Sequence, residues 1–118
     1  GLWLPCGGHV EEGEHPRSAA CREIQEELFI EPEMLLDQPL LITQAVTVGS
    51  SRGHTDVSLW YVFRGSIEAQ IEFDHSEFFG VQWFDLDALP LERSDPHMSR
   101  FRAKLVRHLE NFPHGSDF

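Results

Sequence analysis

The sequence has few basic residues and no long apolar run, and each shortage excludes a class of protein. Its 118 residues carry 20 Asp and Glu against 9 Lys and Arg, a formal net charge of −11 at pH 7. A protein that binds the backbone of DNA or RNA needs clustered Lys and Arg to displace counterions, so we expect no nucleic-acid polymer as a partner. No apolar stretch approaches the roughly 20 residues of a membrane span, and no basic segment leads into an apolar one as in a signal peptide. We therefore predict a soluble protein without membrane attachment.

Cysteine and histidine patterns that bind metals are also missing. Cys6 and Cys21 form no C-x-x-C pair, and the seven histidines show neither H-x-H nor H-x-x-x-H spacing, so a zinc site has little support. A chain of this size needs no disulfide framework, and we expect reduced thiols and a cytoplasmic location. With 41% hydrophobic residues, the chain is long enough for one modest core. We predict a single domain over residues 1–118.

The residue pattern predicts a strand, a loop, a helix, several strands and a final helix. Ala20, Ile24 and Leu28 recur every four residues and form the apolar stripe of a helix from residue 16 to about residue 28. Asp95 is a good N-cap for the last helix, whose apolar stripe runs to Phe112. Strands are predicted over residues 40–48, 56–64, 67–73 and 79–84. This order indicates an α/β fold in which a mixed sheet packs between helices.

The negative charge is concentrated in the first third of the chain. The 27 residues from Glu11 to Asp37 contain nine carboxylates and two arginines, and so hold seven of the 11 excess charges. On the predicted helix, Glu23, Glu26 and Glu27 fall within an arc of about 100°. Oxygen ligands at this density suit a hard cation such as Mg²⁺ or Mn²⁺, although a solvated acidic face is the alternative interpretation. A calcium-binding surface ranks lower because the chain lacks the D-x-D-x-D-G loop of the EF-hand.

The same acidic segment resembles the Nudix box, the loop-helix signature of the Nudix hydrolases, written G-x5-E-x7-R-E-U-x-E-E-x-G-U with U apolar. Eight of its nine specified positions match, namely Gly8, Glu14, Arg22, Glu23, Ile24, Glu26, Glu27 and Ile30. The lead-in Leu4-Pro5-Cys6-Gly7-Gly8 is also similar to the family's L-P-G-G approach. Phe29 stands where the family has the glycine that serves the turn after the helix, so we expect a different helix end there.

The resemblance implies the Nudix α/β/α sandwich, with a mixed β-sheet between helices, and hydrolysis of a nucleoside diphosphate linked to another moiety, X. The likeness to MutT-like members, in a compact chain without an obvious accessory module, favours a nucleoside triphosphate, oxidised or unmodified. The products would then be a nucleoside monophosphate and pyrophosphate. One alternative is hydrolysis of another such substrate, for example ADP-ribose. A second is a non-catalytic nucleotide-binding or regulatory module, against which the complete set of box carboxylates argues.

Roles for the residues of the box follow from the same resemblance. Glu26 and Glu27 would be direct ligands of Mg²⁺ or Mn²⁺, and Glu23 would be either a ligand or the base that takes a proton from the attacking water. The carbonyl of Gly8 would add a further ligand. Arg22 would hold a glutamate in place by a charge-assisted hydrogen bond.

Further candidates lie outside the box. Glu77 precedes a W-F pair that is similar to a strand end common in the family, and members often place a metal-binding or catalytic glutamate just upstream of it. Arg52 and His54 occupy the loop between two central strands, where they would be placed to meet a phosphate. Asp56 and Phe79 are candidates for the pocket of the base. For the charged residues the alternative is a solvated loop, and for Phe79 it is core packing.

The start of the chain carries an expectation of its own. The sequence opens at Gly1-Leu2-Trp3-Leu4 without a Met. Because the resemblance implies a strand before this segment, we expect a leading strand to be missing and a sheet edge to be exposed. We predict that two copies of the chain pair through that edge as a homodimer.

Overall fold

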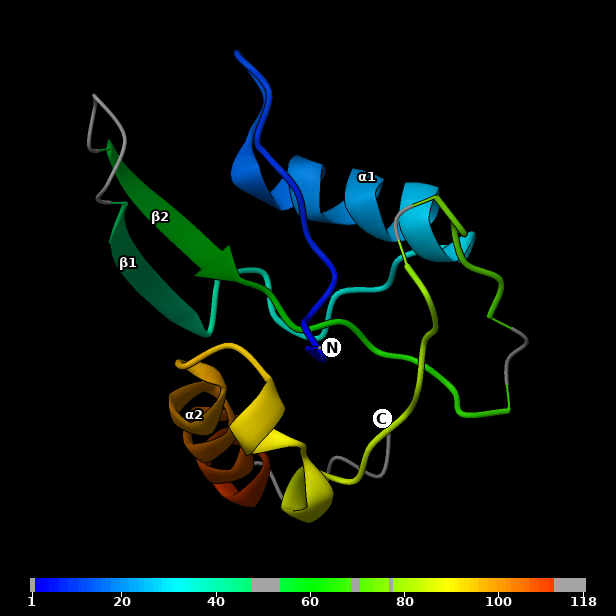
Figure 1. Cartoon of the computed structure of the whole chain (residues 1–118), viewed down its shortest axis with the longest axis vertical. Coiled ribbons are helices and arrows are strands. Elements are labelled where there is room, and N and C mark those ends of the chain that lie inside the picture. Colours follow the sequence, from blue (N-terminus) through cyan, green and yellow to red (C-terminus); the bar gives the residue numbers. More distant parts are fainter. Residues whose placement is uncertain (1, 48–53, 69–70, 77, 112–118) are drawn as a thin grey trace.

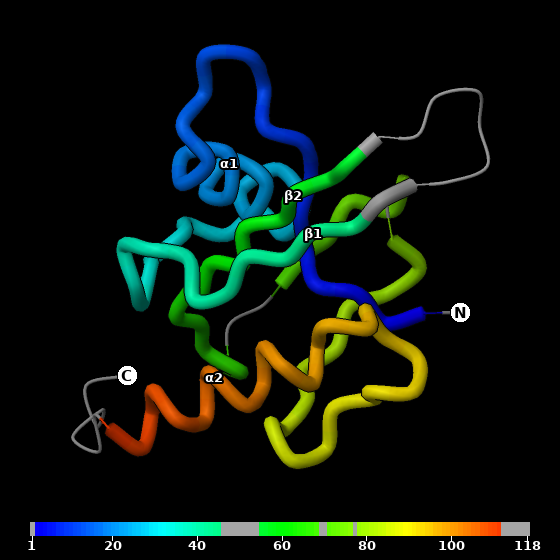
Figure 2. Tube along the Cα trace, turned by 90° about the vertical axis from the view of Figure 1, so that its left-hand side faces the viewer, coloured from blue at the N-terminus to red at the C-terminus, as the bar shows by residue number. Residues whose placement is uncertain are grey.

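Two helices and one β-hairpin form the framework of the protein. The computed structural model describes residues 2–47, 54–68, 71–76 and 78–111. In chain order, its elements are α1 (Pro16–Leu28), β1 (Leu41–Thr47), β2 (His54–Trp60), the single 3₁₀ turns η1 (Leu86–Ala88) and η2 (Leu91–Arg93), and α2 (Met98–Asn111). In both Figure 1 and Figure 2 the hairpin lies between α1 on one side and α2 on the other.

Helix α1 has the predicted bounds but ends differently from our expectation. The His15 Nδ1 atom accepts the Arg17 N–H at 3.0 Å and caps the N-terminus, with Pro16 at the first helical position. At the other end the Phe29 N–H donates to the Gln25 carbonyl, and Phe29 has φ 54° and ψ 36°. Phe29 thus makes the left-handed turn usually given to glycine, and the expectation of a different helix end was wrong.

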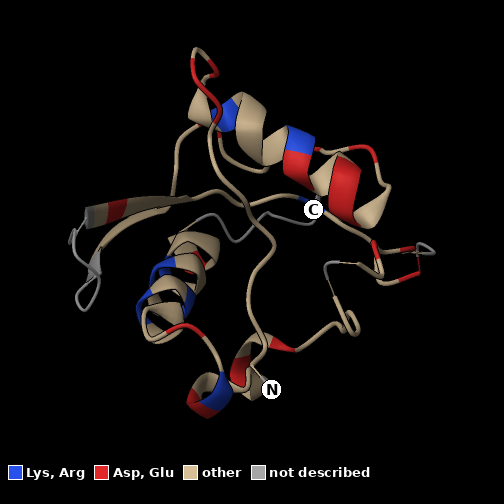
Figure 3. Ribbon diagram, turned by 45° about the horizontal axis from the view of Figure 1, so that its top comes forward, with Lys and Arg blue, Asp and Glu red and all other residues tan. Residues whose placement is uncertain are grey.

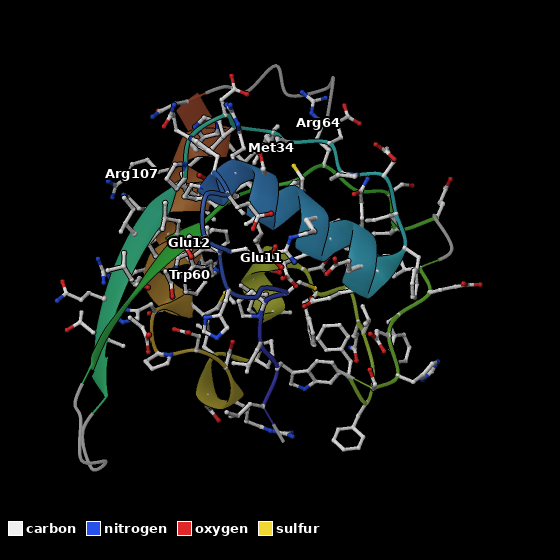
Figure 4. The ribbon with its side chains drawn as sticks, turned by 90° about the horizontal axis from the view of Figure 1, so that it is seen from above. Glu11, Glu12, Met34, Trp60, Arg64 and Arg107 are labelled. Carbon is white, nitrogen blue, oxygen red and sulfur yellow. The ribbon has the colours of Figure 1, made fainter. Side chains whose placement is uncertain are left out.

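The hairpin pairs two strands in antiparallel register, from Leu41 opposite Trp60 to Thr47 opposite His54. The second strand begins two residues earlier than predicted and ends at Trp60 rather than at residue 64. Beyond Trp60 the chain still pairs with the segment that follows α1. The Arg64 N–H donates to the Glu33 carbonyl at 2.7 Å, and the Leu35 N–H donates to the Val62 carbonyl at 2.9 Å. Figure 4 accordingly shows Met34 beside Arg64. The segment that follows α1 is therefore tied to the end of the hairpin strand.

The core lies on the face of the hairpin that meets α2. Trp60 is buried, its ring centroid lies 5.1 Å from that of Phe101, and its indole N–H donates to Thr43 Oγ1 at 3.0 Å. Figure 4 shows Trp60 on the side of the hairpin toward α2. On the opposite face, Ile42 and Val57 are each 58% exposed. Only one face of this hairpin is thus covered by apolar packing.

The two later strands of the prediction are not formed in the described residues. In the described parts of residues 67–73 and 79–84 the backbone is neither strand nor helix, so the observed sheet is two-stranded and antiparallel rather than mixed. Ile67 is 75% exposed and Phe79 is fully exposed, so their apolar side chains find no buried face. A strand also needs backbone hydrogen bonds to a neighbouring strand. The Phe78 N–H instead donates to the Asp74 carbonyl, four residues earlier in the chain.

The N-terminal segment crosses the molecule without joining the sheet (Figure 1). The Trp3 N–H donates to the Arg93 carbonyl at 2.7 Å, and the Trp3 ring meets the Phe84 ring edge-on at a centroid distance of 5.2 Å. Just before α2, Asp95 accepts the His97 N–H through its carboxylate and the Met98 N–H through its carbonyl, but α2 begins at Met98 and not directly after Asp95, as the predicted N-cap would require. The N-terminal segment therefore packs against residues 84–93.

Candidate functional site

Arg22 lies at the centre of the acidic residues on α1. Its Nε and Nη2 atoms donate to the Glu14 carboxylate at 2.9 and 3.0 Å, a two-bond pairing that fixes the guanidinium plane. Its Nη1 atom donates to Glu23 at 2.9 Å and to Glu26 at 3.3 Å. Nη2 also donates to the carbonyl of His9 in the preceding loop. One cation thus connects the glycine loop, Glu14 and two glutamates of the helix.

The ion pair with Glu14 is the strongest electrostatic feature of this cluster. The hydrogen bond from Arg22, followed by that from the Glu11 N–H, lowers the pKa of Glu14 to about 2. The same hydrogen bond raises the pKa of Arg22 above its ordinary value. Both groups are therefore charged at neutral pH, and Glu14 anchors the guanidinium while Nη1 faces the glutamates of the helix. Figure 3 shows the acidic residues on α1 and its flanking loops.

Gly8 approaches the carboxylate of Glu23 more closely than any other residue type could. A Cβ built at Gly8 would lie 2.7 Å from Glu23 Oε2 and nearer still to the other two carboxylate atoms. At the preceding Gly7, a Cβ would meet nothing within 4 Å. The glycine at position 8 therefore allows the backbone of the loop to lie against Glu23.

Glu27 lies in the last turn of α1 and is buried, with 6% of its surface exposed. Burial of the Cys6 thiol, and after it the negative charge of Glu27, raise the pKa of Cys6 to about 11. The carbonyl of Glu27 accepts the Asp74 N–H at 3.0 Å. This bond brings residues 74–76 to the end of α1, beside the row of glutamates.

The donor set suits a divalent cation, although the described side chains are not gathered around one point. Within residues 2–47, 54–68, 71–76 and 78–111, no three His, Cys, Asp or Glu side chains converge as a ready metal cluster. Instead, the positive Nη1 group of Arg22 lies between Glu23 and Glu26. The Glu26 side chain is 59% exposed, and its carboxylate is paired with Arg22 at 3.3 Å. Carboxylates beside a close-lying glycine backbone are the hard oxygen ligands that Mg²⁺ and Mn²⁺ prefer.

The remaining predicted residues do not form one pocket. Glu77, Arg52 and the side chain of His54 lie outside the described residues. Asp56 is exposed on β2 opposite Ala45, and Phe79 is fully exposed. The structure therefore offers no grouping of Asp56 with Phe79 in a base pocket.

A cavity that the sequence did not reveal opens beside the glutamates. It has a volume of about 290 Å³ and is lined mainly by apolar side chains from the N-terminal segment, the end of α1 and residues 71–98. Its aromatic walls are Trp3, Phe78, Trp83 and Phe84. Cys6 and Leu28 also line it, so it adjoins the buried end of α1 where Glu27 lies. The W-F pair at residues 83–84 was the one sequence feature that pointed to this cavity. Its contact with Trp3 depends on the folded chain and could not be predicted from the sequence.

A loop that delivers a glycine to a row of Arg-bridged glutamates on the following helix is the arrangement of a Nudix-type site. The NUDIX domain family model matches residues 1–107, and the chain therefore belongs to the Nudix family. Members of this family are typically pyrophosphohydrolases of nucleoside diphosphates linked to a second moiety, and they generally use divalent metals. No curated protein and no solved structure matches this chain.

One further feature concerns membranes. Among the described residues, neither α1 nor α2 has the length and the apolar content that crossing a bilayer would require.

Proposed function

We propose that this chain is a divalent-metal-dependent pyrophosphohydrolase that cleaves a nucleoside triphosphate into a nucleoside monophosphate and pyrophosphate. The observation that carries the proposal is the close approach of the Gly8 backbone to Glu23, on the helix that also carries Glu26 and Glu27. The φ of Gly8 does not lie in the left-handed region, so the absence of a Cβ, and not an unusual backbone conformation, is what allows this approach. Loop and helix together supply oxygen donors of the kind that a Mg²⁺–polyphosphate complex requires.

The residues of the box divide the work of hydrolysis. Glu26, Glu27, Glu23 and the Gly8 carbonyl are proposed to hold Mg²⁺ or Mn²⁺, which when bound would offset the charge of the phosphates and activate water. Glu14 holds the guanidinium of Arg22 by two hydrogen bonds, and the Nη1 group of Arg22 thereby positions Glu23 and Glu26 for the ion that they would bind. A carboxylate, either Glu23 or Glu77, accepts the proton of the attacking water as its oxygen bonds to phosphorus. The bridging P–O bond then breaks and pyrophosphate leaves with that bond's electron pair.

The cavity beside Glu27 is proposed to hold the nucleobase. Its walls combine Trp3, Phe78 and Trp83, whose rings suit a flat heterocycle, and its volume of about 290 Å³ accommodates one base. Cys6 and Leu28 line the cavity, and Leu28 follows Glu27 directly in α1, so a base in the cavity would lie close to the row of glutamates. The aromatic lining supports a nucleotide but does not select one base over another.

The direct test is hydrolysis by Glu27→Gln compared with wild type. Purified protein with Mg²⁺ or Mn²⁺ should release phosphate products from a panel of nucleoside triphosphates, and Glu27→Gln should lower kcat by at least about 100-fold. Glu12→Gln is the matched control, because Glu12 is an exposed loop carboxylate outside the Arg22 cluster. A wild-type protein that releases no product from any nucleotide, or a Glu27→Gln variant with near-normal turnover, would refute the proposal.

Two other functions remain candidates. Release of products from ADP-ribose but not from triphosphates would assign another nucleoside diphosphate-X substrate. Tight nucleotide binding without turnover would instead identify a regulatory module on the same fold. The complete row of box glutamates and their arginine favours catalysis, because binding alone does not require them at these spacings.

We further propose that the chain forms a homodimer through an edge of its sheet and acts in the cytoplasm. The described sheet has only two strands, and strand edges of this kind offer unpaired N–H and C=O groups to a second copy. Both cysteines are free, as a reducing compartment would keep them. Sedimentation should give the mass of two chains, and a monomer at micromolar concentration would refute the dimer.

A further inference from the structure

We infer that Trp83 is the residue that stacks on the nucleobase, and that Gly65 is a positioning residue that sets the place of the Trp83 indole. The inference rests on the proposed function, in which the cavity holds the base, and deepens it by assigning the stacking contact to one of the four aromatic walls. Gly65 lies outside the Nudix box and does not line the cavity, so it acts on the base through Trp83.

The backbone of Gly65 lies directly against the indole of Trp83. A Cβ built at Gly65 would lie 2.8 Å from Cη2 of Trp83, and 3.6 and 3.8 Å from Cζ2 and Cζ3. Two carbon atoms attract best at about 3.5–4.0 Å, so a side chain at position 65 would force the indole to move. The φ of Gly65 is not in the left-handed region, so the indole, and not the backbone conformation, is what excludes a Cβ.

The chain that leads into Gly65 is held by backbone pairing. The Arg64 N–H donates to the Glu33 carbonyl at 2.7 Å, and Met34 forms an isolated β-bridge with Phe63. Residues 33–35 follow α1, so this pairing anchors Gly65 to the segment that leaves the helix of the glutamates. The indole of Trp83 therefore rests on a backbone whose position the fold determines.

Among the aromatic walls of the cavity, Trp83 offers the largest ring surface that no other ring covers. Trp3 and Phe84 contact each other edge-on at a centroid distance of 5.2 Å, so part of their surface is already used. Trp83 makes no ring contact with another described side chain, and it is 49% exposed although it lines the cavity. Phe78 has a smaller ring, and stacking on a base gains with ring area.

This arrangement predicts an effect on binding and not on the chemical step. A base stacked on Trp83 makes the same contact before and during cleavage of the phosphates, so the contact stabilises substrate and transition state equally. Gly65→Ala displaces the indole and should therefore raise KM while kcat stays near the wild-type value. The variant should remain folded, because the half-exposed indole can move aside.

The test measures the dissociation constant of α,β-methylene-ATP with Mg²⁺, a nucleotide that has carbon in place of the bridging oxygen and is not cleaved there. Trp83→Leu should weaken binding by on the order of 10-fold, the loss expected for one base–aromatic stack, whereas Trp83→Phe keeps a ring and should lose much less. Gly65→Ala should weaken binding severalfold. Gly7→Ala is the matched control, because a Cβ at Gly7 meets nothing within 4 Å, and it should bind as the wild type does.

Tryptophan fluorescence separates stacking from a purely structural role. Trp60 is buried against Phe101 and Trp3 packs on Phe84, so a base that stacks on Trp83 should quench mainly the emission of Trp83. Most of the quenching by the nucleotide should therefore disappear in Trp83→Phe, although that variant still binds. A merely structural tryptophan would leave the quenching unchanged in a variant that retains affinity.

Three results would overturn the inference: wild-type affinity in Trp83→Leu, equal affinities of Gly65→Ala and Gly7→Ala, or a larger loss in Phe78→Leu than in Trp83→Leu. Failure of the wild type to bind the nucleotide would overturn it as well. Thermal melts check that each variant is folded, and the two Trp83 variants decide the stacking contact should Gly65→Ala unfold. Absence of hydrolysis by the wild type would refute the proposed activity, while the binding series still decides the roles of Trp83 and Gly65.

Discussion

Arg22 offsets repulsion that would otherwise oppose α1. Glu23 lies three residues before Glu26 and four before Glu27, and each like-charge pair at this spacing costs about 0.2–0.5 kcal/mol in an isolated helix. The guanidinium bonds to Glu23 and Glu26 but shares its charge with Glu14, so it neutralises only part of the row. A single arginine therefore permits the helix to fold while leaving excess negative charge for a cation.

Gly8 gives the sharpest residue-scale prediction. Gly8→Ala should retain the fold, because the clashing atoms are the far end of the flexible Glu23 side chain, but the carboxylate must move. We expect kcat to fall by on the order of 10-fold, since small displacements of catalytic groups are costly. Gly7→Ala is the control, because a Cβ there has open space, and it should retain wild-type turnover. Steady-state kinetics with thermal melts checks this prediction, and equal activity of the two variants would contradict it.

Glu14 predicts how stability depends on acid. Its pKa is lowered from 4.5 to about 2 in the folded protein, chiefly by Arg22, so its stabilising contribution is present above pH 4.5 and is lost as the pH falls toward 2. Glu14→Gln removes the charge and should lose this contribution at every pH. Urea unfolding at pH 7, 4 and 3 should show a gap between wild type and variant that narrows with acid. A gap that is constant or widens would contradict the assigned ion pair.

At the scale of elements, α1 was predictable because its signals are local. The four-residue apolar spacing, Pro16 at the start and the box itself all lie within one segment, and the observed bounds match those predicted. The residues at 67–73 also alternate as a strand does, but alternation predicts a strand only where a neighbour supplies hydrogen bonds. That neighbour is a long-range property of the fold. The local pattern could therefore indicate extended chain there but not pairing.

The hydrogen bond from Trp60 to Thr43 joins the two strands, and its contribution to the stability of the hairpin can be measured. Both residues are buried, so Thr43→Val would leave the indole N–H without its acceptor and should lower the free energy of unfolding by about 1–3 kcal/mol. Thr55→Val on β2 is the control, because Thr55 is exposed and such changes typically stay within about 0.5 kcal/mol. Chemical denaturation followed by tryptophan fluorescence measures both. A Thr43→Val variant as stable as the control would show that this bond does not hold the hairpin.

At the scale of the whole molecule, the predictable part of the site was its glutamate row. Gly8, Arg22 and Glu27 lie within 20 residues of one another, and one motif fixes their spacing. The cavity has walls from both Trp3 and Trp83, which are 80 residues apart, and their meeting depends on the packing of the entire chain. Sequence reasoning accordingly assigned a base pocket to Asp56 and Phe79, which the structure does not place in that cavity.

The two helices differ in their balance of charges. Figure 3 shows acidic residues on α1 and its loops and basic residues on α2, which carries Arg100, Arg102, Lys104 and Arg107. The net charge of −11 is thus not spread evenly, and repulsion is greatest around the Nudix box. A cation bound there would relieve repulsion within the folded state itself.

This division predicts that divalent cations stabilise the fold beyond the effect of ionic strength. A ligand at 100 times its dissociation constant adds about 2.7 kcal/mol to the free energy of unfolding, so millimolar Mg²⁺ or Mn²⁺ should raise the thermal midpoint by several degrees. NaCl at matched ionic strength screens exposed charges but cannot bridge Glu26 and Glu27, and should raise it less. The difference should disappear in Glu27→Gln and persist in Glu12→Gln. Equal shifts with MgCl₂ and NaCl in the wild type would mean that the acidic row is only a solvated surface, because screening alone would then account for the stabilisation.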